Sequence, residues 1–98
     1  MSSAESSLAS IHCTVRGQVQ GVFFRAFVQH HAEALRLTGY TRNLPAGNAV
    51  EVHAEGEREQ LEILLQHLHQ GPRSARVKEV ETKWGDHTGG FTNFEVAF

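Results

Sequence analysis

The sequence has little of what makes covalently stapled, metal-bound or membrane-embedded proteins. Among 98 residues there is one cysteine, Cys13, so neither an internal disulfide nor a zinc–thiolate cluster can form. No apolar run approaches the ~20 residues of a membrane-spanning helix. The formal net charge of −2 argues against attachment to nucleic acid through a bulk positive field. We therefore expect neither a membrane nor a nucleic-acid partner.

What is present suits one compact domain. The hydrophobic fraction is 40% and the charged fraction 20%, which is ordinary for a globular protein and too apolar for a disordered one. The Ser- and Ala-rich start carries Glu5 and lacks the basic and apolar segments of a signal peptide. We expect a flexible tail over residues 1–9, a domain over residues 10–98, a monomer and a cytoplasmic location.

Hydrophobic periodicity predicts alternating strands and helices. Residues 10–16 alternate, with Ile11, Cys13 and Val15 on one face, as in a half-buried strand. From Phe24 the spacing is helical. The remaining expected elements are the end of this helix at Gly39, a hairpin over 40–43 and 50–54 ended by Gly56, a helix around Leu61–Leu68 stopped by Gly71-Pro72, a strand over 77–84 and a closing strand over 91–98.

This order, β-α-β-β-α-β plus a short closing strand, predicts an α+β fold. The expected architecture is a ferredoxin-like two-layer sandwich, an antiparallel sheet with two helices on one face. Val77 and Val80 fall on opposite faces of the expected strand, which indicates a bulge. Because this fold hosts enzymes, RNA binders and ligand sensors, it does not decide the function.

Two segments carry candidate chemistry. Gly17 to Arg25 is a glycine-bounded loop between a strand end and a helix start, where backbone N–H groups can converge on an anion. Arg25, in the first helical turn, can fork onto two oxygens of that anion. Asn43 lies at a hairpin mouth. From the residues alone, the glycines and Asn43 are equally consistent with ordinary turn chemistry.

Gly17-x-Val19-Gln20-Gly21-Val22-x-Phe24-Arg25 resembles the signature loop of the acylphosphatase family, and Gly39-Tyr40-x-Arg42-Asn43 resembles its second motif. The likeness extends over Ile11 to Phe98. It implies hydrolysis of the carboxyl–phosphate bond of acyl phosphates, giving a carboxylate and inorganic phosphate without metal or cofactor. It also implies that Asn43 orients the attacking water and that the phosphate is held by Arg25 and the loop amides. The loop residues concerned are Gln18, Val19, Gln20, Gly21, Val22 and Phe23.

Two positions depart from the family pattern. Thr41 stands where the family usually has a small apolar residue, and threonine is shaped like valine. The hairpin has an additional residue between Gly47 and Val50, which we expect to lengthen its tip away from the site. A slip in the pairing register here would turn the side chains of the strand over.

Other functions are open to comparison. A non-catalytic phosphate- or anion-binding regulatory module on the same fold would need the loop but has no evident need for Asn43. An RNA-binding domain would want a basic sheet face and exposed aromatics. The seven histidines include His30-His31 and His67-x-His69, whose spacings diverge on a helix, so we expect no metal site. Cys13 faces inward and is not expected to act as a nucleophile.

Overall fold

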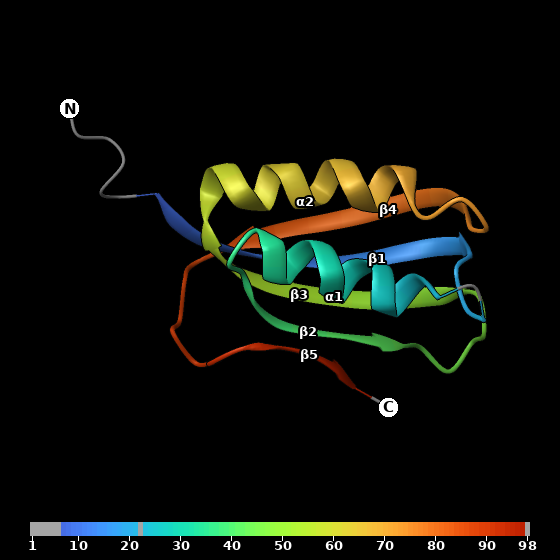
Figure 1. Ribbon diagram of the computed structural model, residues 1–98, viewed down its shortest axis with the longest axis horizontal. Coiled ribbons are helices and arrows are strands. Elements are labelled where there is room, and N and C mark those ends of the chain that lie inside the picture. The colour runs from blue at the N-terminus through green and yellow to red at the C-terminus, as the bar shows by residue number, and fades with distance from the viewer. Residues whose placement is uncertain (1–6, 22, 98) are drawn as a thin grey trace.

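The protein forms a two-layer α+β sandwich in a computed structural model that describes residues 7–21 and 23–97 (Figure 1). Its elements in chain order are β1 (Leu8–Gln18), α1 (Phe24–Ala34), β2 (Thr38–Asn43), β3 (Ala49–Glu57), α2 (Arg58–Gln70), β4 (Arg76–Gly85) and β5 (Phe94–Ala97). The strands form one sheet in the order β4-β1-β3-β2-β5, and both helices cover the same face of it (Figure 1). The expected ferredoxin-like fold is confirmed.

The closing strand gives the sheet a mixed character. The β1–β3, β1–β4 and β2–β3 pairs are antiparallel, as expected, whereas β5 runs parallel to β2. β4 and β5 lie at the two edges of the sheet and run in opposite directions, so residues 86–93 join them across one end of the sheet (Figure 1). The expectation of a wholly antiparallel sheet is corrected at the β2–β5 edge.

The boundaries of β1 and α1 differ from those expected. β1 begins at Leu8, which pairs with Glu57, so residues 8–9 of the expected tail belong to a strand and residues 1–6 lie outside the described residues. α1 ends at Ala34, because Arg36 adopts the left-handed conformation (φ 60°). The N–H of Leu37 then bonds to the carbonyl of Ala32 at 2.9 Å, closing a Schellman-type cap without glycine.

Gly39 therefore serves β2 and does not end the helix. Its φ is 137°, and a Cβ at this position would lie 1.9 Å from the carbonyl oxygen of His53 on β3. A glycine here permits close approach of the two backbones. Gly56 likewise lies inside β3 and does not end it. The expected end of α2 is confirmed, since Gly71 is its C-cap.

The irregularity expected between Val77 and Val80 is a bulge in β4. Arg16 of β1 pairs with Glu79, but Gly17 pairs with Val77, so Lys78 has no opposing residue. The extra residue restores the inward phase, because Val77 and Val80 both pack against the core.

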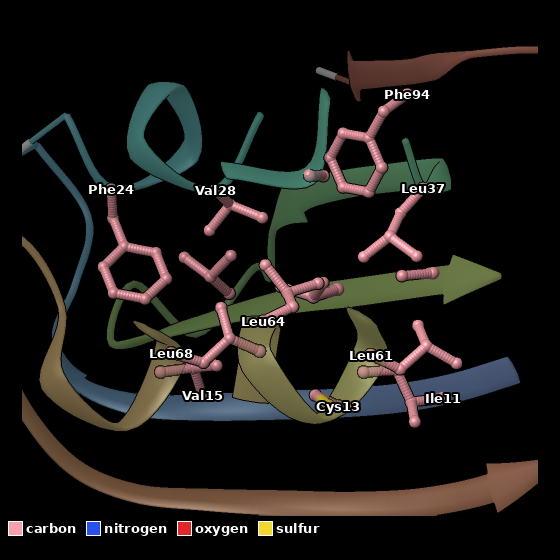
Figure 2. Packing of buried hydrophobic residues seen from close by; sticks show 14 of the residues in the cluster. Ile11, Cys13, Val15, Phe24, Val28, Leu37, Leu61, Leu64, Leu68 and Phe94 are labelled. Atoms are coloured by element: carbon pink, nitrogen blue, oxygen red, sulfur yellow. The ribbon is translucent and has the colours of Figure 1, made fainter. Parts of the chain in front are cut away.

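The core lies between the sheet and the helices (Figure 2). It takes its side chains from the inward faces of β1 and β3 and from one stripe of each helix. Full burial of each large aliphatic or aromatic side chain contributes about 1.5–3 kcal/mol. Members with no more than 1% exposure include Ile11, Cys13, Val15, Phe24, Val28, Val50, Val52, Leu61, Leu64 and Leu68.

Candidate active site

Three segments that are distant in sequence meet at one end of the sheet. They are the β1–α1 loop, the end of β2 and the end of β5 (Figure 1). Between them lies a pocket of about 320 Å³. Arg25 and Asn43, which the sequence places in separate motifs, both line it. The other lining residues are Val19, Gly21, Phe23, Phe24, Ala26 and Val96.

The β1–α1 loop is bent by residues in the left-handed conformation. Gly21 has φ 75°, and Phe23 has φ 61° and ψ 24°. Left-handed residues let neighbouring N–H groups converge on one point, as in anion-binding nests. Phe23 is also the N-cap of α1 and makes no side-chain capping bond, so an anion can accept from the first N–H groups of the helix.

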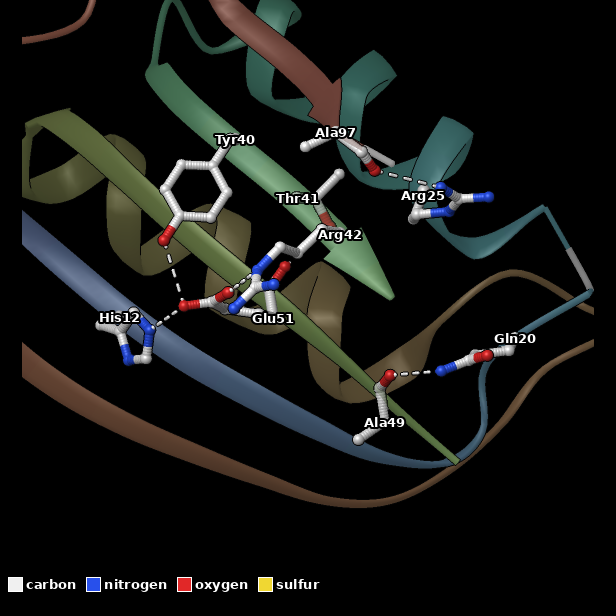
Figure 3. A network of polar contacts seen from close by, with 9 residues as sticks. All are labelled: His12, Gln20, Arg25, Tyr40, Thr41, Arg42, Ala49, Glu51 and Ala97. Carbon is white, nitrogen blue, oxygen red and sulfur yellow. Dashed lines mark hydrogen bonds and ion pairs between the residues drawn. The ribbon is translucent and has the colours of Figure 1, made fainter. Parts of the chain in front are cut away.

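The loop is braced against the β2–β3 hairpin. The Gln20 Nε2 donates to the carbonyl oxygens of Leu44 (2.9 Å) and Ala49 (2.8 Å), the latter shown in Figure 3. The Gly17 N–H donates to the carbonyl of Asn48 at 3.0 Å. The hairpin therefore contacts the loop and the strand that leads into it, and none of residues 44–48 is among the pocket residues.

The register of the hairpin keeps Asn43 on the helix-covered face. Asn43 pairs with Val50, and Thr41, two residues earlier, is fully buried on that same face. The Thr41 hydroxyl donates to the carbonyl of Glu51 at 2.9 Å, so the polar atom at this usually apolar position is satisfied. Neither departure from the family pattern displaces Asn43.

Asn43 itself holds an unusual polar atom. Its Oδ1 is buried and has no hydrogen-bond partner among the described residues. Buried polar groups are nearly always paired with protein or water, because leaving one unpaired costs about 1–3 kcal/mol. An unpaired amide oxygen on the wall of a pocket is an acceptor for a group that enters the pocket.

Arg25 projects from the first turn of α1 toward β5 (Figure 3). Its Nη1 donates to the carbonyl of Ala97 at 3.2 Å. One turn later the Gln29 Nε2 donates to the carbonyl of Phe94 at 3.3 Å, so β5 is bonded to the same helix twice. These contacts orient a planar guanidinium beside the loop.

The other predicted loop residues divide between the pocket and the sheet. Val19, Gly21 and Phe23 line the pocket. Gln18 is the last residue of β1, where it pairs with Arg76 of β4, and Val22 lies outside the described residues.

Sequence reasoning missed the contribution of β5, namely Val96 in the pocket wall and the Ala97 carbonyl beside Arg25. Alternation of Phe94 and Val96 indicated a strand. Nothing in the sequence indicated which strand it would join.

Cys13 is poorly suited to act as a nucleophile. Burial raises the pKa of the Cys13 thiol to about 11, although a bond to the Thr82 hydroxyl opposes the shift, so a thiolate nucleophile is disfavoured.

Within residues 7–21 and 23–97, no three His, Cys, Asp or Glu side chains are grouped as metal ligands. In that same part of the chain no helix is long and apolar enough to cross a membrane.

Fold and pocket together define an α+β domain with a candidate anion site at a helix N-terminus. The acylphosphatase family model matches residues 11–96, and the chain belongs to that family. It is 57% identical to the acylphosphatase of Thermus thermophilus over 75 residues, which cover 76% of this chain and 84% of that protein. It is 45% identical to that of Pelotomaculum thermopropionicum, covering 94% and 99% of the two chains.

A solved structure has the same fold. The structure of an acylphosphatase from Coxiella burnetii superimposes with a TM-score of 0.88 and 40% identity, over 99% of this chain and 100% of that one. The family resemblance of the two sequence motifs is thus confirmed. Family membership classes the chain as a hydrolase acting on acyl phosphates.

Proposed function

We propose that this chain hydrolyses acyl phosphates by direct attack of water, with the phosphoryl group held by the β1–α1 loop and Arg25 and the water oriented by Asn43. The observation that carries the proposal is the buried, unpartnered Oδ1 of Asn43 on the wall of the pocket that Arg25 also lines. A site for binding alone needs only the arginine and the loop. Hydrolysis also needs a group that orients water, and the Oδ1 of Asn43 can accept a hydrogen bond from that water. The non-catalytic regulatory module is therefore not favoured.

Arg25 and the loop supply charge stabilisation. The guanidinium offers two parallel N–H donors to phosphoryl oxygens, and each charge-assisted bond contributes roughly 1.5–3 kcal/mol. The backbone N–H groups of the loop after Gln18 and of the start of α1 add donors without adding bulk. Phosphoryl transfer depends mostly on such positioning and electrostatic stabilisation, since charge stays on the equatorial oxygens.

Asn43 aligns the attacking water. Its Oδ1 accepts a hydrogen bond from the attacking water while its Nδ2 donates to an acyl or phosphoryl oxygen. As the water oxygen bonds to phosphorus, the bond to the acyl oxygen breaks, and the acyl group leaves as a carboxylate. The water proton passes to a phosphoryl oxygen. A carboxylate is a good leaving group, so no strong base is required.

We also propose that the protein acts as a monomer in the cytoplasm, without nucleic acid, metal or cofactor. Within one chain, Arg25 and Asn43 already line the same pocket. The near-neutral charge balance gives no bulk attraction to nucleic acid.

Turnover of a simple aryl acyl phosphate tests the proposal directly. The purified chain, incubated with benzoyl phosphate, should consume the mixed anhydride faster than it decays in buffer. A chelator should leave the rate unchanged, and inorganic phosphate should inhibit competitively. Loss of the mixed anhydride at the spontaneous rate would rule out the enzyme, and activity lost to a chelator and restored by a divalent ion would rule out this mechanism.

Arg25→Ala should lower phosphate affinity, because the guanidinium bonds the ground-state phosphoryl group, and should also lower kcat, because its fixed charge stabilises the transition state more strongly. Arg25→Lys should retain only part of the parent's phosphate affinity and kcat, since an ammonium cannot reproduce the planar fork. Arg16→Ala is a matched control: Arg16 forms ion pairs with Glu79 (3.6 Å) and Glu81 (3.0 Å) and is not among the pocket residues. A fully active Arg25→Lys would show that charge alone is needed.

A further inference from the structure

Phe23 combines two properties that stability does not explain. It is a bulky residue in the left-handed conformation, which costs roughly 1–3 kcal/mol outside glycine. Its side chain is also 84% exposed, so it gains little from burial in the core. Glycine or asparagine would adopt this backbone more easily. The strain and the exposure together point to a role for the ring outside the folded core.

The ring of Phe23 is held at the pocket by its backbone. The Phe23 carbonyl accepts the first hydrogen bond of α1, from the Phe27 N–H at 3.0 Å, which fixes residue 23 against the helix. Arg25 follows two residues later in the same turn. Phe23 thus lines the pocket beside Arg25, and its high exposure leaves the side chain open to a molecule that enters from solvent.

The rest of the pocket wall is largely apolar. Ala26 and Val96 lie in that wall together with Phe23, Val19 and Phe24. The phosphoryl group uses the polar donors, and water attacks in line with the leaving group, so the acyl group lies on the side of the phosphorus away from the water. The apolar wall then remains for the acyl substituent, and Phe23, unlike the buried Phe24, offers it an exposed ring.

We propose that Phe23 is a specificity-determining residue that contacts the acyl substituent, so that the chain prefers acyl phosphates with aromatic or other apolar acyl groups over those with a small one. The proposal rests on the proposed function of the same pocket. An aromatic pair gains through offset or edge-to-face contact as well as through buried area. The proposed phosphate contact of Phe23 is its backbone N–H, so removal of the ring should affect the acyl substituent more than the phosphate.

The test compares benzoyl phosphate with acetyl phosphate as substrates of the parent chain and of three variants. Phe23→Ala removes the ring and keeps the strained backbone, Phe23→Gly removes both, and Phe23→Leu keeps an apolar side chain. Phe91→Ala is the matched control, because Phe91 packs on Tyr40 and His53, away from the pocket. The readouts are kcat/KM for each substrate and the inhibition constant of inorganic phosphate.

Phe23→Ala and Phe23→Gly should each lower kcat/KM for benzoyl phosphate by about 3- to 10-fold relative to acetyl phosphate, the factor that an aromatic contact commands. Phe23→Leu should fall between, and Phe91→Ala should keep the parent's ratio. In each active Phe23 variant the loss should be larger for benzoyl phosphate than for acetyl phosphate or inorganic phosphate. An unchanged substrate ratio in active Phe23→Ala, or an equal loss for both substrates and for phosphate, would overturn the proposal. A parent chain that hydrolyses neither substrate would instead refute the proposed function on which it rests.

Discussion

Asn43 and Glu55 each have buried side-chain oxygen on the paired strands β2 and β3, yet these oxygens are partnered in opposite ways. Both oxygens of the Glu55 carboxylate accept hydrogen bonds, from the Thr88 N–H (3.1 Å), the Thr88 hydroxyl (2.7 Å) and the Gly89 N–H (3.0 Å). The Oδ1 of Asn43 has no partner among the described residues. A satisfied buried group stabilises the fold, whereas an unsatisfied one weakens it and marks where a ligand is to complete the bonding.

The two groups also serve opposite ends of the sheet. Glu55 holds the connection between β4 and β5 at one end, and Asn43 faces the pocket at the other (Figure 1). A second saturated carboxylate, Glu51, lies on the face away from the helices, where His12, Tyr40 and Arg42 bond to it (Figure 3). If fully partnered groups such as Glu55 are structural and unpartnered ones such as Asn43 are functional, substitutions at the two positions should change different measurements.

The largest expected effect is on catalysis, at Asn43. Asn43→Ala should lower kcat by about 10²–10³, the usual loss when one positioning or stabilising group is removed. Inorganic phosphate should bind nearly as before, and the free energy of unfolding should not fall, because no hydrogen bond to Oδ1 is lost. Asn43→Asp should be at least as inactive, since a carboxylate repels the phosphate.

Steady-state kinetics, a phosphate titration and thermal unfolding of each Asn43 variant provide these readouts. Retention of most of the turnover by Asn43→Ala would make Asn43 a turn residue. The water-positioning role would then belong to another group.

The next effect is on stability, at Glu55. Glu55→Ala leaves the amides of Thr88 and Gly89 without their acceptor and should lower the free energy of unfolding by about 1–3 kcal/mol. Denaturant titration measures this, with the exposed Glu95→Ala as the control. Because Glu55 is remote from the pocket, the kcat of the folded variant should stay within a few-fold of the parent. A selective loss of kcat in the folded Glu55→Ala protein would contradict the separation of a structural group at Glu55 from a functional one at Asn43.

The smallest expected effect is on the decrease in folding stability at acidic pH. Burial raises the pKa of Glu55, but the bonds from the Thr88 hydroxyl and the two amides outweigh it, so the pKa lies below its ordinary value. At Glu51 burial likewise raises the pKa, but the bonds from His12, Arg42 and Tyr40 outweigh it, so this pKa also lies below its ordinary value. A lowered pKa means that the folded state binds protons less readily than the unfolded one.

The stabilisation from both carboxylates should therefore be complete above the ordinary glutamate pKa of about 4.3 and be lost as the pH falls below it. Thermal unfolding between pH 7 and pH 3 measures the loss, and Glu55→Gln should make the decline shallower. A decline of equal slope in this variant would show that Glu55 does not contribute.

Much of this arrangement could be predicted from the sequence because it depends on local patterns. Alternation identified β1, Gly71 identified the end of α2, and the phase change between Val77 and Val80 identified the bulge. The two motifs brought Arg25 and Asn43 forward as site residues, and the structure places both in one pocket.

What could not be predicted depends on distant partners. Gly39 resembles a helix cap until the backbone of His53 is seen against it. Glu55 sits in an alternating strand, where a glutamate would be expected in solvent, and only the 86–93 connection explains its burial. The left-handed backbone of Phe23 has no local signal, because glycine and asparagine are the residues that usually adopt it.

The position of β5 also bears on protein synthesis. It is the last of the seven elements in chain order, and its Ala97 carbonyl bonds to Arg25, 72 residues upstream. Chains emerge from the ribosome in the order in which they are made, and contacts between distant residues form late. The elements β1 to β4 all precede β5 and leave the ribosome before it. The guanidinium reaches its final setting only after β5 has emerged, so acquisition of activity should lag behind acquisition of the fold.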